Sequence, residues 1–273
     1  MNTKSNHPRR RIYPLAGALL AGWLLSSQAS AQVNYDTSGD LYTENFDAGL
    51  SSSAANLPWT DNSVFAGWSA YQISTSGAPA EYRRTGGDSS LAEVFQWRDG
   101  AGASDGAFGS KPNDTTGDIL RGIQITNASG ATLNSITIGY TGEQWYESGI
   151  VQNNQLVVAY QVGSPTNLSA GSWTEIPSLI FDTPQNTGAG QNLDGNAAAN
   201  RVVFTPTAVT ISGWDGGTDL WIRWFDSNSS GVDQGLGIDD FSFSAVPEPS
   251  QYAILFGLCA LMLTVCRRQG ARK

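Results

Sequence analysis

The sequence predicts an all-β protein whose body is a single β-sandwich of jelly-roll type, with a signal peptide before it and a transmembrane helix after it. Short segments of alternating apolar and polar residues recur along the body, which is typical of half-buried strands. Turn-forming pairs such as Asp99-Gly100 and Asp194-Gly195 separate these segments, and long amphipathic helical patterns are absent. The body covers residues 32–245, a length that suits one sandwich rather than two domains.

The alternating segments predict where the strands lie. Residues 135–140 place Ile136, Ile138 and Tyr140 on one face, because successive side chains of a strand point to opposite faces. Pro206 interrupts the segment 202–211, so we expect one strand on either side of it. Residues 220–225 carry large side chains on both faces, which predicts a central strand. The other predicted strands cover residues 41–46, 156–160 and 238–243.

Residues 1–31 have the layout of a secretory signal peptide. A basic head ends in Arg9 to Arg11, an apolar run of 11 residues extends from Leu15 to Leu25, and Ala29-Ser30-Ala31 forms a cleavage site. A helix of that length is too short to cross about 30 Å of hydrocarbon. We expect signal peptidase to cut after Ala31, and an uncleaved membrane anchor is the alternative.

Residues 246–273 combine a proline-bracketed acid, an apolar run and a basic end. The tripeptide Pro247-Glu248-Pro249 comes first, Tyr252 to Cys266 follow as 15 residues without a charge, and Arg267 and Arg268 come next. The apolar run predicts a short transmembrane helix at about residues 252–266. Both arginines should stay on the cytoplasmic side, because basic residues that flank a span resist translocation. The body would then lie outside the cytoplasmic membrane.

This three-part layout resembles the PEP-CTERM sorting signal of exported proteins in Gram-negative, exopolysaccharide-producing bacteria. The resemblance covers about a tenth of the chain. It implies that exosortase, a membrane-embedded cysteine protease and transpeptidase, recognises Pro247, Glu248 and Pro249. The chain would be held in the membrane by its C-terminal helix, processed, and placed at the cell surface or in the extracellular matrix. The two prolines hold the motif extended and remove backbone donors, which suits entry into a protease groove.

Five stretches of the body carry a second resemblance: Glu44 to Asp47, Tyr140 to Trp145, Leu193 to Arg201, Trp221 to Trp224 and Gly235 to Phe241. In these stretches the body resembles a recurrent exported domain of bacterial surface proteins. The resemblance implies a fold and a surface location, and it implies no ligand.

The composition of the body excludes several classes of function. Of the 15 basic and 24 acidic residues in the chain, the body keeps 7 and 23, which gives it a formal charge of −16. This charge argues against nucleic-acid binding, which needs a basic surface. The only histidine, His7, lies in the signal peptide, and both cysteines lie in the apolar run near the C-terminus. A Ser-His-Asp triad, a zinc site built on imidazole and a thiol nucleophile are therefore excluded from the body.

One segment has the oxygen spacing of a calcium-binding loop. Asp226, Asn228 and Ser230 carry oxygen at alternate positions and are followed by a glycine, as at the start of such a loop. The bidentate glutamate expected at the twelfth position is absent, and Asp233, Asp239 or Asp240 could replace it from nearby. Ca²⁺ is therefore the one cofactor that the sequence suggests, and a surface turn rich in Asp and Asn is the alternative.

Aromatic residues near loops are the candidate glycan contacts. Trp59, Trp145 and Trp214 lie beside predicted turns, where an indole ring could stack on a pyranose ring while neighbouring polar groups bind hydroxyls. Trp221 and Trp224 lie within a predicted strand, and we expect both to be structural.

Two classes of function stay open at the level of sequence. The first is a non-enzymatic surface or matrix protein that binds glycan, with exopolysaccharide as the expected partner. The alternative is a secreted hydrolase acting on polysaccharide, which needs two carboxylates about 5–9 Å apart across one bond. Asp239 and Asp240 are neighbours on a strand, so we expect one to face solvent and the other to cap a buried donor or pair with Arg223. No acid pair is selected by its spacing, which favours the first class.

Overall fold

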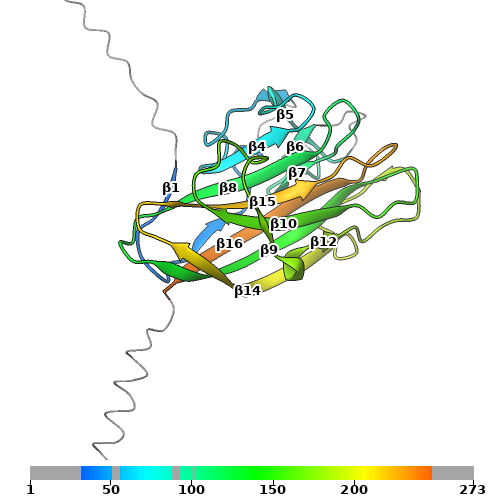
Figure 1. The fold of residues 1–273 in the computed structure, drawn as a ribbon. Coiled ribbons are helices and arrows are strands. Elements are labelled where there is room, and N and C mark those ends of the chain that lie inside the picture. The colour runs from blue at the N-terminus through cyan, green and yellow to red at the C-terminus, as the bar shows by residue number, and fades with distance from the viewer. Residues whose placement is uncertain (1–31, 51–55, 88–92, 101, 248–273) are drawn as a thin grey trace, which may run out of the picture.

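The chain folds into two packed β-sheets, and the predicted β-sandwich is confirmed (Figure 1). The computed structural model describes residues 32–50, 56–87, 93–100 and 102–247. The predicted signal peptide, the predicted membrane helix, Glu248, Pro249, Arg267 and Arg268 lie outside these residues. Within the described ranges, no helix has the length and apolar character needed to cross a membrane.

The first sheet has seven strands in the order β1-β8-β15-β10-β11, with β4 beside β8 and β12 beside β10. Its centre is formed by β8, β15 and β10, which pair antiparallel along most of their length. The strand bounds are β1 (Val33–Tyr35), β4 (Trp68–Gln72), β8 (Ile119–Asn127), β10 (Gln155–Val162), β11 (Thr174–Glu175), β12 (Phe181–Asp182) and β15 (Asp219–Asp226), and a 3₁₀ helix, η1 (Pro177–Leu179), precedes β12.

The second sheet has nine strands in the order β13-β9-β16-β7-β6-β5-β3, with β14 beside β9 and β2 beside β16. Its longest strand, β9, lies between β16 on one side and β14 on the other. The bounds are β2 (Tyr42–Glu44), β3 (Asn56–Pro58), β5 (Glu81–Thr85), β6 (Val94–Arg98), β7 (Gly106–Ser110), β9 (Leu133–Glu147), β13 (Gln191–Asn192), β14 (Arg201–Trp214) and β16 (Gly235–Val246).

All the strands expected from the alternating segments are present, and one expectation about them is wrong. Residues 220–225 form most of β15, which lies between β8 and β10, so its predicted central position is confirmed. Residues 202–211 form one continuous strand, β14, instead of two strands divided by Pro206. The register of β14 on β9 shifts between Phe204 and Thr207, so Pro206 lies at a bulge. Because β14 pairs only with β9, a missing N–H there removes no bond to a second neighbour.

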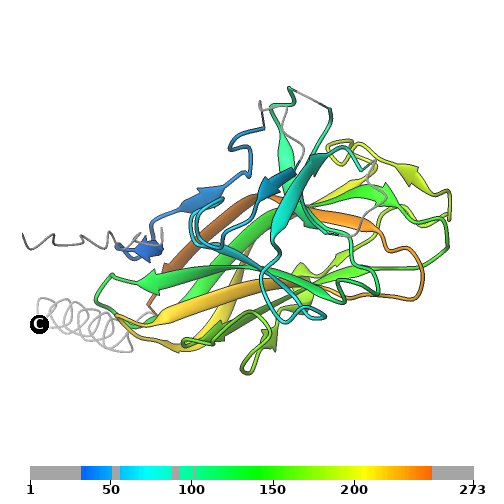
Figure 2. The ribbon, with the colours of Figure 1, turned by 90° about the horizontal axis from the view of Figure 1, so that it is seen from above.

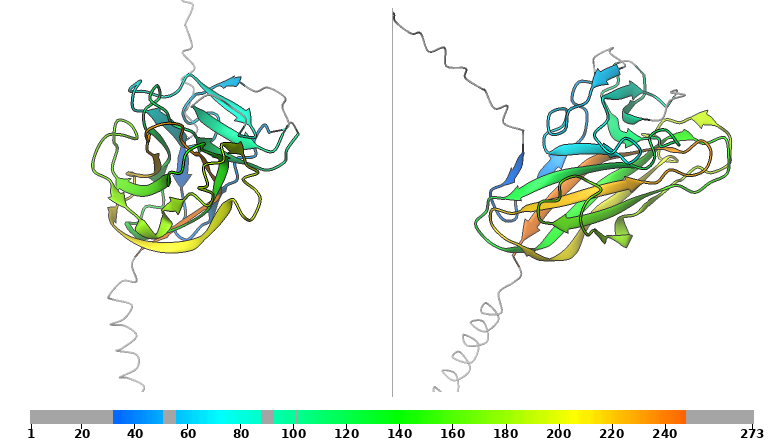
Figure 3. Two further views of the ribbon diagram at one scale, coloured as in Figure 1. Left: turned by 90° about the vertical axis from the view of Figure 1, so that its right-hand side faces the viewer. Right: turned by 45° about the horizontal axis from the view of Figure 1, so that its top comes forward.

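Figures 2 and 3 show the two sheets as layers, seen from above and from one end. An aromatic cluster fills the space between these sheets. Trp68 from the first sheet lies with its ring centroid 5.2 Å from that of Phe241 and 6.0 Å from that of Phe108 in the second sheet. Trp224 lies 5.6 Å from both Trp68 and Phe241, so its predicted core position is confirmed. Burial of each such side chain contributes about 1.5–3 kcal/mol to folding.

Tyr35 joins the first and last strands of the described chain. Its hydroxyl lies 2.8 Å from the carbonyl oxygen of Asp40 and 3.1 Å from that of Ala245, and it accepts the N–H groups of Gly39 and Ala245. Hydrogen bonds through Tyr35 therefore connect the segment after β1 to the end of β16. The sheet continues to Val246, which pairs with Ser135 of β9, and Pro247 follows directly as an exposed residue. The expected sorting motif thus begins where the sandwich ends.

A buried polar pair lies between the sheets beside the aromatic cluster. Arg121 of β8 is fully buried, and its Nη1 donates to the carbonyl oxygens of Phe108 (3.2 Å) and Leu236 (3.0 Å). Asp226 at the end of β15 is also fully buried and accepts a hydrogen bond from the Ser110 hydroxyl. Burial raises the pKa of Asp226 to about 8 and the charge of Arg121 opposes that rise, so Asp226 is mostly protonated at neutral pH.

We predict that Arg121→Met destabilises the protein by about 1–3 kcal/mol, because the buried carbonyl oxygens of Phe108 and Leu236 lose the guanidinium that donates to them. Adding Asp226→Asn to Arg121→Met should cost less than Asp226→Asn alone, since the attraction between Arg121 and Asp226 is already lost in the single variant. Denaturant unfolding of both single variants and the double variant measures the coupling between the two residues. Strictly additive changes in the free energy of unfolding would show that the pair does not act as a unit.

Candidate functional site

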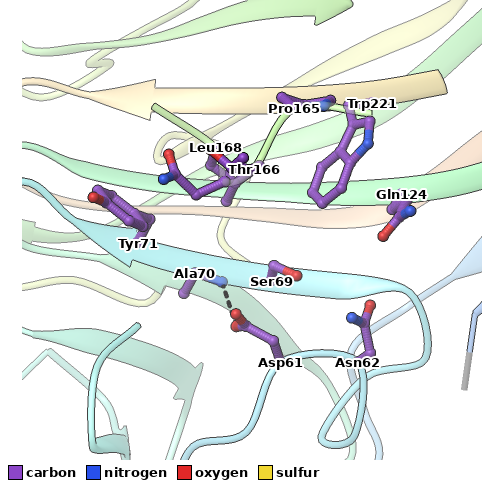
Figure 4. A pocket seen from close by; sticks show the side chains of 11 residues that line it. Asp61, Asn62, Ser69, Ala70, Tyr71, Gln124, Pro165, Thr166, Leu168 and Trp221 are labelled. Carbon is purple, nitrogen blue, oxygen red and sulfur yellow. Dashed lines mark hydrogen bonds between the residues drawn. The ribbon is translucent and has the colours of Figure 1, made fainter. Parts of the chain in front are cut away.

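A groove of about 340 Å³ crosses the outer face of the seven-stranded sheet. Its floor comes from β4, β8 and β15, one wall comes from the loop that precedes β4, and the other wall comes from the loop that follows β10. Figure 4 shows Tyr71 and Trp221 at two ends of the groove, with Ser69 between them and Asp61 and Asn62 on the wall opposite Leu168. The lining residues are Asp61, Asn62, Ser69, Ala70, Tyr71, Gln124, Pro165, Thr166, Asn167, Leu168 and Trp221.

Strand alternation decides which side chains reach this groove. In β15, Leu220, Ile222 and Trp224 point into the sandwich, so Trp221 points out. The same alternation turns Tyr71 of β4 and Gln124 of β8 outward.

Gly122 lets the far wall approach the sheet. A Cβ atom at this position would lie 2.7 Å from the Cδ2 atom of Leu168 and 2.5 Å from the carbonyl oxygen of Ile222. Any larger residue at position 122 would therefore push Leu168, and the loop that carries it, away from the sheet.

Arg223 holds that loop in place. Its Nη1 donates to the carbonyl oxygen of Leu168 at 2.6 Å, and its guanidinium lies 4.1 Å from the ring centre of Trp173. The side chain of Asn167 accepts the N–H groups of Ser169 (2.9 Å) and Ala170 (3.0 Å), which closes a tight turn at the rim. The wall is therefore a hydrogen-bonded loop rather than a loose one, so the groove is largely preformed.

The groove combines aromatic surface with hydrogen-bonding groups. Oδ1 of Asp61 accepts from Trp59 Nε1 (2.6 Å) and from the N–H of Ala70 (3.0 Å), which fixes the carboxylate at the rim. Burial raises the pKa of Asp61 above its usual range. Oδ1 of Asn62 and Nε1 of Trp221 are buried and have no hydrogen-bond partner in the described part of the chain. Both atoms are covered in this structure, so they are unsatisfied polar groups beneath the surface of the groove.

The three tryptophans expected to contact glycan are not surface platforms. Trp145 and Trp214 are fully buried and Trp59 is 6 % exposed, so the prediction for all three is wrong. Trp145 packs with Phe95 and Trp97 on the outer side of the nine-stranded sheet, beneath the loop that holds Gly195. These rings lie near turns in the sequence, but they are packed inside the protein. Burial of their large apolar area stabilises the fold more than exposure to a ligand site would.

The remaining two predicted glycan residues each have an internal contact of their own. Trp214 packs against Tyr35 at a ring distance of 6.0 Å. Trp59 stacks on Phe108 at 5.2 Å with an interplanar angle of 8°, and it reaches the groove only through its hydrogen bond to Asp61.

The groove contains an aromatic residue that the sequence analysis placed in the core. Trp221 is 8 % exposed and packs against Leu120 and Leu168 outside the sandwich, so it is structural as expected but also lines the groove. Tyr71, Asp61 and Asn62 were not identified from sequence. The alternation of residues 220–225 did contain a signal, because Trp221 cannot share a face with Leu220 and Ile222.

The predicted calcium-loop residues make separate hydrogen bonds within the protein. Asp226 is turned between the sheets toward Ser110, and Asn228 donates from its side chain to Asp114 at 3.1 Å. Asp233 is buried and accepts from Asn154 Nδ2 (3.0 Å) and from the N–H of Ser229 (3.1 Å), whereas Ser230 is exposed. This arrangement matches the alternative, a hydrogen-bonded turn rich in Asp and Asn.

No group of three or more His, Cys, Asp or Glu side chains converges as a metal site within the described ranges.

A second polar region lies on the outer face of the nine-stranded sheet. Glu143 of β9 is 1 % exposed, and its Oε2 accepts from Trp145 Nε1 at 2.9 Å. Asp239 of β16 is 3 % exposed, whereas Asp240 is exposed and has a positive φ of 49° at a bulge. One of these two aspartates faces solvent, as expected, but the buried one does not pair with Arg223, which lies in the other sheet.

Burial raises the pKa of Glu143 to about 7 and, together with the charge of Glu143, raises that of Asp239 to about 9. Glu147, four residues along β9, behaves differently. Burial opposes ionisation there as well, but hydrogen bonds from Thr187 and Gln191 hold its pKa at about 2.

We predict that the protein loses stability as the pH rises from about 5 to about 9 in a buffer that contains a chelator. Glu143 and Asp239 have pKa values raised above their usual range, so folding favours their protonated forms. Their stabilising contribution is complete below the unfolded-state pKa and is lost as the pH passes the folded-state values. Melting temperatures across this range measure the effect, and Glu143→Gln and Asp239→Asn should each flatten the curve. An unchanged slope in both variants would assign the effect to other groups.

The comparisons with known proteins do not assign a family. No protein-family model matches the sequence, and no curated protein matches it. Tailspike protein 4 of bacteriophage CBA120 aligns at a TM-score of 0.35 with 10 % identity. The alignment covers 66 % of this chain and 20 % of the tailspike chain.

Two further solved structures are aligned over almost their whole length. A xylan-binding domain of Paenibacillus barcinonensis aligns at a TM-score of 0.33 with 10 % identity, over 77 % of this chain and 97 % of that one. The K3 cleaved adhesin domain of Lys-gingipain from Porphyromonas gingivalis aligns at 0.34 with 12 % identity, over 74 % and 97 %. Similarities of this size do not establish a shared ligand.

Proposed function

We propose that this chain is an exported, non-enzymatic surface or matrix protein that binds polysaccharide in the groove of its seven-stranded sheet. The observation that carries the proposal is the groove itself. It presents two aromatic side chains, Tyr71 and Trp221, together with two buried polar atoms that lack a partner among the described residues.

A neutral sugar chain suits this combination of groups. The half-buried ring of Tyr71 offers apolar surface to the C–H face of a sugar ring, and Trp221 forms part of the groove floor. The accessible side chains of Gln124, Thr166 and Asn167 supply polar groups for hydroxyls. Asp61 adds a further carboxylate oxygen at the rim. None of the lining residues is basic, so the groove has no group that would select a phosphate or sulfate. The preformed loop wall keeps the ordering cost of binding low.

The two ends of the chain support export and sorting. We propose that signal peptidase removes residues 1–31 and that exosortase recognises Pro247, Glu248 and Pro249. We further propose that the helix at about residues 252–266 holds the chain in the membrane until processing. Pairing of β16 through Val246 supports this order of events, because the motif then follows the folded body without a linker. The hydrogen bond between Tyr35 and Ala245 would hold the end of β16 in place while exosortase acts on the segment that follows.

We also propose that the connections are those of a jelly roll. The long strands β8, β9, β10, β14, β15 and β16 belong alternately to the first and second sheets, so each connection crosses the sandwich. This crossing pattern supports the finer classification.

The alternative of a polysaccharide hydrolase has less support. The acid pair Glu143 and Asp239 is covered, at 1 % and 3 % exposure, so a glycosidic bond has no access to it in this structure. The groove carries one carboxylate, Asp61, whereas the glycosidase mechanisms considered need two across the same bond.

We predict that Tyr71→Ala and Asn62→Ala each weaken polysaccharide binding by about tenfold, because they remove an aromatic surface and a polar side chain from the groove lining. A glycan array followed by calorimetry on the best glycan measures the change. Tyr146→Ala is the matched control, since Tyr146 is a half-buried aromatic residue on the other sheet. Equal affinity of the Tyr71 and Asn62 variants and the unaltered protein would exclude the groove as the binding site.

We predict that the surface-associated form ends upstream of Lys273, because processing at the sorting motif removes the membrane helix and the basic end. Mass spectrometry of the mature C-terminus tests this. Replacement of Pro247, Glu248 and Pro249 by alanine should leave the full-length chain in the membrane fraction. An intact Lys273 on the surface-associated protein would contradict the proposed processing.

A further inference from the structure

Glu143 and Asp239 form a buried acid pair on two neighbouring strands of the nine-stranded sheet. Strands β9 and β16 run side by side (Figure 1). Glu143 lies opposite Gly237, and Asp239 lies opposite Thr141. Residues that are opposite each other share a face, and residues two apart on one strand share a face as well. Both carboxylates therefore project from the outer face of this sheet at diagonal positions, and the charge of each acts on the other.

Each member of the pair keeps one oxygen without a partner. Oε1 of Glu143 and Oδ1 of Asp239 are buried and accept no hydrogen bond from any described residue. The second oxygen of Glu143 is held by the indole N–H of Trp145, which fixes the direction of the carboxylate. An unsatisfied buried acceptor is costly, and either a proton or a bound cation at these positions would relieve that cost.

The surroundings of the pair are mostly acidic. Asp105 and Asp240 are exposed, and their charges act on both Glu143 and Asp239. Arg201, on the β14 side of Glu143, is also exposed and acts on Glu143. Among the described groups that act on the pair from outside, Arg201 is opposed by Asp105 and Asp240, so the local field favours a proton or a cation between the two carboxyl groups.

We propose that Glu143 and Asp239 bind a calcium ion on the outer face of the nine-stranded sheet. Hard divalent cations prefer oxygen ligands, and Ca²⁺ accepts six to eight of them in a flexible geometry. The two buried oxygens provide the fixed ligands, and solvent, with the exposed carboxylates of Asp105 and Asp240 turning inward, completes the shell. Because described carboxylates do not converge as a set of three, this completion accompanies binding.

This calcium site is independent of the polysaccharide groove. The groove lies on the seven-stranded sheet, whereas the acid pair lies on the outer face of the other sheet. It also shares no residue with the segment 226–233 that the sequence suggested for calcium. The role that follows is stabilisation of β9 against β16, because the ion would bridge these two strands across the outer face.

Trp145 provides a built-in reporter for the test. Its indole donates to Glu143, so an ion bound by that residue lies within a few side-chain lengths of the ring. Tb³⁺, a luminescent substitute for Ca²⁺, should therefore show emission sensitised by tryptophan when it occupies the site. Added Ca²⁺ should displace Tb³⁺ and quench this emission.

The decisive experiment compares the purified protein with Glu143→Gln, Asp239→Asn and the exposed control Glu81→Gln. Calcium should raise the melting temperature of the unaltered protein and of the control. Each amide variant should lower calcium affinity by at least about tenfold, because it removes a ligand. The amide replacements keep side-chain size, and without calcium they should fold at least as well as the unaltered protein, which separates loss of a ligand from loss of the fold.

Two outcomes would overturn the proposal. If calcium leaves the melting temperature unchanged and Tb³⁺ shows no sensitised emission, the two carboxyl groups share a proton instead of an ion. If both amide variants keep the full calcium response, the ion is bound elsewhere, for example in the segment 226–233.

Discussion

Packing of one aromatic cluster between two sheets determines most of what this protein presents to solvent. Trp68, Trp224, Phe108 and Phe241 meet at the centre of the sandwich, with ring distances between about 5 and 6 Å. Because these rings point inward, they decide which alternate residues of β4, β7, β15 and β16 face the core. Once the phase is fixed, every second residue of these strands must point outward. The side chains of the groove floor and of the acid pair point outward from these strands and from their neighbours β8 and β9.

The same constraint explains how two different chemical surfaces arise on one small body. On the seven-stranded sheet the outward residues include Tyr71, Gln124 and Trp221, and a hydrogen-bonded loop folds over them to make a groove. On the nine-stranded sheet they include Glu143 and Asp239, which lie next to a small second core around Trp145. The aromatic groove and the acid pair thus lie on opposite outer faces of the sandwich.

Individual residues show why sequence reasoning succeeded for strands and failed for the candidate site. The alternation in 220–225 predicted a central strand, because large residues on both faces require cover on both sides. Trp145, Trp214 and Trp59 were expected at the surface because turns lie near them, but nearby loops and strands cover all three. Asp61 and Tyr71 meet Trp221 through strand pairing and loop position, which are long-range relations that no local pattern contains.

The sequence by itself determined the class of the protein and the limits of its chemistry. Its periodicity of two required strands, and the absence of histidine and cysteine from residues 32–245 removed whole families of mechanism. Its two ends predict export and sorting without reference to a fold, because the proteins that process such chains recognise short linear segments. The tertiary structure alone decided which aromatic rings are buried, that Pro206 lies within a continuous edge strand, and which acids share a face. Those properties depend on pairing between strands that are distant in the sequence. Burial of an aromatic ring is favourable wherever the tertiary structure covers it, so its position near a turn does not decide its exposure.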